Sequence, residues 1–178
     1  MRSSAQLLFM TLLVSCSGLS ARAGETLTSK DGRVQIQLPE GYSEKTPPKP
    51  TIKIEAVDGG AGATLLVISE NQKDFASLAE YGEIVRGQMM ERLKDPQGNA
   101  GEKLEIGDHP AIRYEITGIS SNGMRMAFLV TVIQTETRFN QVVGSCMRVN
   151  FADHKADFVK VAETLKELPP KPDERSHS

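Results

Sequence analysis

The chain has 178 residues, of which 39% are hydrophobic and 25% are charged, a composition typical of one globular domain. Its 21 basic and 23 acidic residues give a net charge of −2, and the basic residues form no cluster. This mild acidity argues against nucleic acid and anionic lipid surfaces as main partners.

The beginning of the chain has the organisation of a secretory signal. The basic residue Arg2 precedes an apolar run at 7–14, and small residues close the segment at Ala21 and Ala23. We therefore expect residues 1–23 to be a signal peptide that is cleaved after Ala23. The apolar run is far shorter than the roughly 20 residues that a membrane-spanning helix needs, so we expect no transmembrane segment.

A second processing site overlaps the first. Cys16 follows Leu-Val-Ser, the pattern at which bacterial lipoproteins are cut and lipidated. We favour cleavage before Gly24, which releases a soluble periplasmic protein, and the alternative is a lipid anchor through Cys16. Either outcome exports the chain and leaves Cys146 as the lone thiol of the mature protein. A lone cysteine within a strand-like run is expected to be buried and inert.

The mature chain begins with a short polar stretch. We expect residues 24–32 to be an N-terminal linker. Residues 33–38 then alternate polar and apolar side chains, which predicts a strand with Val34, Ile36 and Leu38 on one face.

An antiparallel pair of strands is expected next. Residues 43–50 contain three prolines and are expected to form an exposed, extended loop. The alternating segments 51–57 and 64–69 predict two strands, and the glycine-rich segment 58–62 predicts the turn between them.

The first helix is predicted from apolar spacing. Asp74 is the expected N-cap, and apolar residues recur at intervals of three and four from Phe75 to Leu93. Asp95 and Pro96 should end this helix, because the residue before a proline disfavours helical geometry. The polar, glycine-containing segment 97–101 is expected to be a mobile loop.

Four strands in succession are predicted after this loop. Runs rich in β-branched and aromatic residues occupy 103–106, 111–120, 124–135 and 139–151, with short turn-rich segments between them. Such spacing is typical of consecutive hairpins, so we expect an antiparallel meander.

A second amphipathic helix is expected to close the domain. It should begin with Asp153 as its cap and extend to Leu168, where two prolines follow. Residues 169–178 are expected to be a disordered tail. Strands joined by short links exclude the crossovers of a parallel sheet, so the predicted class is α+β: an antiparallel sheet of six to seven strands with two helices, in a single domain over 33–168.

These segments also carry a family resemblance. VQIQLPEGY, the helix DFASLAEYGEIVRGQMMERL, the segment LEIGDHPAIRYEITG and the closing FVKVAETLKEL are similar to the PsbP/Mog-like superfamily, and most of all to its bacterial DcrB-like branch. The resemblance implies a sheet sandwiched by helices. It also implies a role in binding or assembly, since members of the superfamily include exported lipoproteins, lumenal assembly factors, a Ran-binding protein and chaperones. It supplies no catalytic residues.

No catalytic motif or cofactor-binding motif is evident from the residues themselves. The spacings typical of zinc, phosphate-loop and nucleophile-elbow sites are missing from the sequence, so we expect neither a metal nor another cofactor. The leading hypothesis is a non-enzymatic envelope protein that holds another envelope protein on a sheet face or in a groove between sheet and helices. The alternatives are a small envelope enzyme with a site near His109, and a carrier of a small apolar ligand in a pocket. His154 is expected at a solvated helix start, and the oligomeric state is left open.

Overall fold

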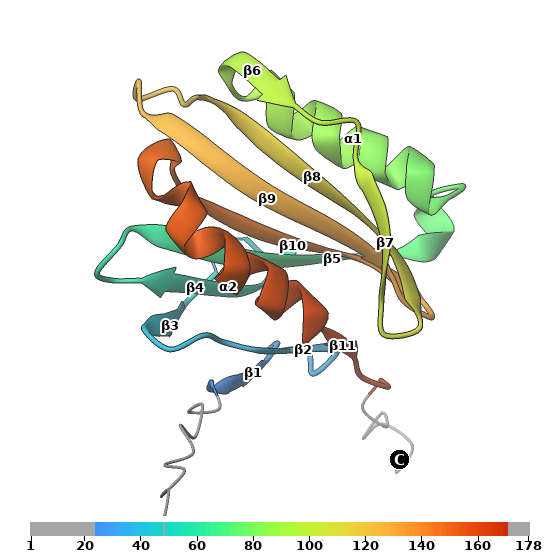
Figure 1. The fold of residues 1–178 in the computed structure, drawn as a ribbon. Coiled ribbons are helices and arrows are strands. Elements are labelled where there is room, and N and C mark those ends of the chain that lie inside the picture. The colour runs from blue at the N-terminus through green and yellow to red at the C-terminus, as the bar shows by residue number, and fades with distance from the viewer. Residues whose placement is uncertain (1–23, 48, 171–178) are drawn as a thin grey trace, which may run out of the picture.

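The protein is built on one large antiparallel sheet with a helix on each face (Figure 1). The computed structural model describes residues 24–47 and 49–170, so the predicted signal peptide, including Cys16 and Ala23, and most of the predicted tail lie outside the described residues. The fold class is α+β, as predicted.

The large sheet has eight strands and the small one has three. In spatial order the large sheet contains β3 (Tyr42–Lys45), β4 (Ile52–Asp58), β5 (Ala63–Asn71), β10 (Arg138–Met147), β9 (Arg125–Gln134), β8 (His109–Ile119) and β6 (Lys94–Gly98), and β7 (Glu102–Ile106) pairs with the other end of β8. The small sheet contains β1 (Thr26–Thr28), β2 (Val34–Gln37) and β11 (Lys166–Glu167). The helices are α1 (Leu78–Glu91) and α2 (Phe151–Glu163).

The predicted strand pairings are confirmed. β4 and β5 pair antiparallel, and β7, β8, β9 and β10 follow one another as an antiparallel meander. Successive side chains of a strand point to opposite faces of the sheet, so each long strand contributes to two cores. Val142 packs in the core under α2, and its neighbour Val143 packs in the core under α1. The predicted inward face of β2 is confirmed, because Val34, Ile36 and Leu38 are all buried.

The first helix begins three residues later than predicted from Asp74. Its N-cap is Ser77, whose hydroxyl accepts a hydrogen bond from the backbone N–H of Glu80 at 3.1 Å. The carboxylate of Glu80 in turn accepts one from the backbone N–H of Ala76 at 2.7 Å. This arrangement resembles a capping box, except that the Glu80 carboxylate reaches the N–H of the residue before the cap, and it fixes the helix start. Asp74 instead ends a short 3-10 turn, Gln72–Asp74.

The second helix is also displaced from its predicted bounds. β10 ends at Met147, a 3-10 turn follows at Arg148–Asn150, and Asp153 lies within the first turn of α2 rather than capping it. The helix ends at Glu163 because the next residues pair with β2, as β11, instead of continuing the helical hydrogen bonds.

Three segments predicted as linker or loop contain short strands. The predicted linker 24–32 contains β1, which pairs with β2 and buries Leu27. The predicted loop 43–50 begins as β3, and the predicted loop 97–101 overlaps β6. All three strands lie at sheet edges, where backbone pairing forms a strand with few apolar side chains.

Candidate functional site

The histidine singled out by the sequence stands apart from other reactive groups. His109 is the first residue of β8, half-buried beside the turn of the β7–β8 hairpin. Its side chain forms no hydrogen bond or ion pair within residues 24–47 and 49–170. In that same part of the chain no three His, Cys, Asp or Glu side chains converge in a way that could hold a metal ion.

His154 is buried, which contradicts the expected solvated position at a helix start. The side chain is 7% exposed, and its Nδ1 atom lies 3.4 Å from the hydroxyl of Tyr42 on β3. Its ring also stacks on Phe158, with the centroids 6.0 Å apart. The imidazole therefore packs in the core on the α2 side, because α2 is rotated to place its first turn against the edge strand β3.

Cys146 lies in the same core, and its side chain has no exposed surface. Burial raises the pKa of its thiol, and the negative charge of Asp153 raises it further. Because the thiolate is the reactive form, we expect no reaction with an aromatic disulfide reagent in the native protein at pH 8. Absorbance should report one thiol only after denaturant is added, and rapid labelling of the native protein would contradict this burial.

An open groove lies between the start of α1 and the β7–β8 hairpin, which are neighbours in the fold (Figure 1). Its volume is about 640 Å³. The residues that line it come from the first turn of α1, from β7, from the start of β8 and from the end of β9: Ser77, Leu78, Ala79, Lys103, Leu104, Glu105, Pro110, Ala111, Ile112 and Gln134.

The groove combines an apolar lining with charged borders. Leu78 and Ile112 supply apolar surface, and Lys103 and Glu105 from β7 supply one charge of each sign. His109 is not one of the lining residues, although it precedes Pro110. A groove between sheet and helix was predicted, but its residues were not, because they come together from segments that are distant in sequence.

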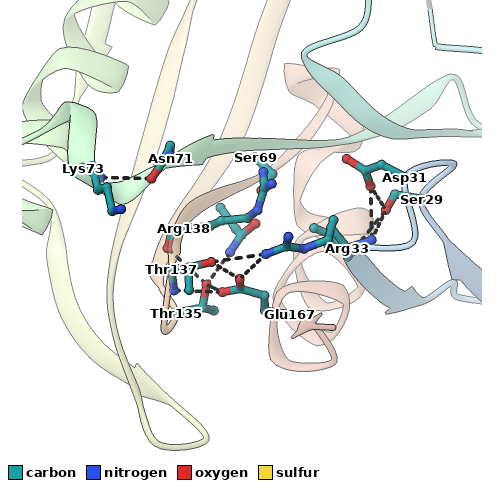
Figure 2. A network of polar contacts seen from close by, with 12 residues as sticks. Ser29, Asp31, Arg33, Ser69, Asn71, Lys73, Thr135, Thr137, Arg138 and Glu167 are labelled. Atoms are coloured by element: carbon teal, nitrogen blue, oxygen red, sulfur yellow. Dashed lines mark hydrogen bonds and ion pairs between the residues drawn. The ribbon is translucent and has the colours of Figure 1, made fainter. Parts of the chain in front are cut away.

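A polar network surrounds Glu167 and the β9–β10 turn (Figure 2). This turn follows Gln134, which lines the groove. Glu167 accepts hydrogen bonds from the hydroxyls of Thr135 (2.6 Å) and Thr137, and from the backbone N–H of Thr137 (3.2 Å). Its carboxylate also forms a 3.3 Å ion pair with Arg33. Burial alone would raise the pKa of Glu167, but these hydrogen bonds outweigh burial and hold the pKa below its usual range.

The same network joins the two sheets. Thr135 and Thr137 belong to the β9–β10 turn, whereas Arg33 and Glu167 belong to the region of β2 and β11. Asn140 on β10 extends the network by donating to the hydroxyl of Thr135 at 2.9 Å. The network therefore ties the β9–β10 turn, which follows the groove residue Gln134, to the small sheet.

Comparisons with known proteins are informative only at the level of the fold. No model of a known protein family matches the chain, and no curated protein matches it in sequence.

None of the helices in the part of the chain that the structure describes is long and apolar enough to span a bilayer.

Several solved structures share the architecture. Cyanobacterial PsbP (CyanoP) from Synechocystis superposes with a TM-score of 0.63 at 13% identity, over 88% of this chain and 99% of that one. LpqN, involved in cell envelope biogenesis of Mycobacterium tuberculosis, has a TM-score of 0.59 at 12% identity, over 82% of this chain and 90% of that one. The Saccharomyces cerevisiae Ran-binding protein Mog1p has a TM-score of 0.54 at 8% identity, over 80% and 94%. The chain therefore has the PsbP/Mog-like fold, and the narrower DcrB-like resemblance stays a prediction.

Proposed function

We propose that this protein is an exported, non-enzymatic accessory protein of the bacterial cell envelope, and that it binds an extended segment of another envelope protein. The observation that carries the proposal is the open, largely apolar groove between α1 and the β7–β8 hairpin. The similarity of fold to LpqN, whose description places it in cell envelope biogenesis, supports an envelope role. The His109 side chain has no hydrogen-bonding partner among the described residues that could activate it, which favours binding over catalysis.

The edge of β7 supports an extended occupant. Within the part of the chain that the structure describes, β7 pairs only with β8, so its other edge has unpaired backbone groups. Three consecutive residues of β7, Lys103 to Glu105, line the groove. A partner strand added to this edge would gain main-chain hydrogen bonds and place alternate side chains against Leu78 and Ile112.

The contacts of Gly24 and Glu25 support cleavage between Ala23 and Gly24. Gly24 packs against the residue that follows β2, because a Cβ atom there would lie 1.5 Å from the backbone oxygen of Leu38. The next residue, Glu25, accepts a 2.7 Å hydrogen bond from the N–H of Leu38. The first two residues that this cleavage would leave thus take part in the packing of the domain. Lipidation at Cys16 is the alternative, and the intact mass of the mature protein distinguishes a free Gly24 terminus from an acylated Cys16.

A pair of matched variants tests the groove. Leu78→Glu places a charge in the groove, and Val149→Glu places the same charge at an exposed position in the 3-10 turn before α2, which does not line it. We expect the wild type and Val149→Glu to recover the same envelope protein in affinity purification, and Leu78→Glu to recover at least about tenfold less, because a buried charge without a partner is costly. Circular dichroism checks that both variants fold. Equal recovery by the two variants contradicts the proposal.

A further inference from the structure

A second hollow lies on the other flank of α1 and is separate from the groove. Its volume is about 210 Å³, and it is bounded by α1, by the segment before α1, and by residues of β5 and β10. Phe75, Tyr81 and Met89 line it from the helix side, and Ile68, Glu70 and Gln141 line it from the sheet. For comparison, a cavity of about 150 Å³ in an engineered protein core is large enough to hold benzene.

A directional chain of hydrogen bonds forms the polar part of this cavity. The amide of Gln141 donates to the hydroxyl of Tyr81 at 2.6 Å, and that hydroxyl donates to the carboxylate of Glu70. Tyr81 is 1% exposed and Gln141 is 8% exposed, so both lie within the protein. Burial, followed by the hydrogen bond to Glu70, raises the pKa of Tyr81, which keeps the hydroxyl protonated as a donor.

The carboxylate at the end of this chain has capacity for more donors. Among the described residues, Tyr81 is the one hydrogen-bonding partner of the Glu70 carboxylate. An ionised carboxylate accepts about four hydrogen bonds. Glu70, which is half-buried, is also the sole anionic residue of the described cavity lining, so the negative charge of this hollow comes from its carboxylate.

The walls suit an apolar body carrying a positive charge. Phe75 meets Tyr81 edge to face with ring centroids 4.4 Å apart, and Tyr81 stacks on Phe139 at 4.8 Å, so the aromatic wall is rigid. Ile68 and Met89 add aliphatic surface. A carboxylate beside aromatic faces attracts ammonium ions. The single cation of the described lining, Arg92, is exposed to water, so its repulsion is screened.

We propose that this cavity is a binding site for a small primary ammonium compound with a short apolar body, its ammonium group on Glu70 and its body against Phe75, Ile68 and Met89. Two sources share this chemistry: a simple amine, and an apolar amino acid whose carboxylate reaches Arg92. The site lies outside the groove, so the proposal does not depend on the partner-binding function.

Three small molecules with the same branched apolar body and different charged groups test the proposal. Isothermal titration calorimetry with isoamylamine, leucine and isovalerate, on the full mature chain, should give binding of isoamylamine or leucine and no binding of isovalerate. Tighter binding of leucine than of isoamylamine identifies the amino acid as the source, and the reverse identifies the amine. Binding of isovalerate alone, equal binding of all three, or no binding of any would overturn the proposal.

Variants locate the site. Glu70→Gln keeps an acceptor for Tyr81 but removes the charge, so binding of the amine should weaken roughly ten- to a hundredfold. Glu91→Gln, at the exposed end of α1, is the matched control and should bind like the wild type. Nuclear magnetic resonance shifts of the amides around Tyr81 supply a second readout, and equal binding by Glu70→Gln and the wild type would overturn the assignment to this cavity.

Discussion

Gly144→Ala should lower the free energy of unfolding by about 2–3 kcal/mol, because the new methyl group has no space. A Cβ atom at this position would lie 2.1 Å from the ring of Phe158, which α2 presses onto the middle of β10. Phe158 is 1% exposed, so its ring cannot move out into solvent. Urea denaturation measures the loss, and the melting temperature should fall by about 2–4 °C for each kcal/mol.

A Gly→Ala substitution in α1 should instead raise the free energy of unfolding. Gly87 lies in α1 with no atom within 4 Å of its would-be Cβ, so Gly87→Ala should gain about 0.5–1 kcal/mol through helix propensity. The Phe158→Leu variant tests the cause of the clash. If Phe158 is responsible, the double variant Gly144→Ala with Phe158→Leu is less destabilised than the sum of the single variants. If the losses of stability in the two single variants are additive, the described contact between Phe158 and Gly144 is contradicted.

Glu167→Gln should cost about 1.5–3 kcal/mol of stability, because both carboxylate oxygens accept hydrogen bonds. One oxygen receives Arg33 and the hydroxyl of Thr137, and the other receives the hydroxyl of Thr135 and the N–H of Thr137. An amide replaces one of these acceptors with a donor, which then faces other donors. Glu163→Gln, at an exposed position of α2, is the control and should unfold like the wild type.

Protonation of Glu167 should account for part of the stability that the protein loses in acid. Its pKa in the folded state is lowered from 4.5, so its stabilising contribution is complete above that pH and is lost as the pH falls through the folded-state pKa. Asp31 acts in the same direction: burial alone would raise its pKa, but hydrogen bonds from Lys53, Ser29 and the Arg33 backbone lower it to about 2. Urea unfolding at pH 7 and pH 3 should therefore show a smaller acid loss for Glu167→Gln than for the wild type. Parallel losses would contradict the network.

Local patterns were sufficient to predict the main elements of the fold. The alternation in β2 correctly predicted a buried face at Val34, Ile36 and Leu38, since alternate residues of a strand point to the same face of the sheet. The hairpins of the meander were predicted from short turn segments between strand-like runs, and they are confirmed. These features depend on neighbours in the sequence.

Features set by distant residues were not predictable in this way. β6 is exposed along its whole length and contains a proline, so no apolar pattern in the sequence indicates its pairing with β8. The burial of His154 depends on Tyr42, which is 112 residues away, and the network at the β9–β10 turn depends on the Arg33–Glu167 pair, which is 134 residues apart. A groove or cavity of this kind is defined by tertiary packing, and one sequence alone carries no pattern for it.

Site-specific photo-crosslinking in living cells tests the partner-binding groove most directly. A photoreactive amino acid at Ala79, an exposed residue that lines the groove, is compared with one at Lys45, an exposed residue of the edge strand β3. The proposed function predicts one discrete adduct with an envelope protein from Ala79, no such adduct from Lys45, and loss of the Ala79 adduct in the Leu78→Glu background. The same adducts from both positions, or none from Ala79, would contradict it.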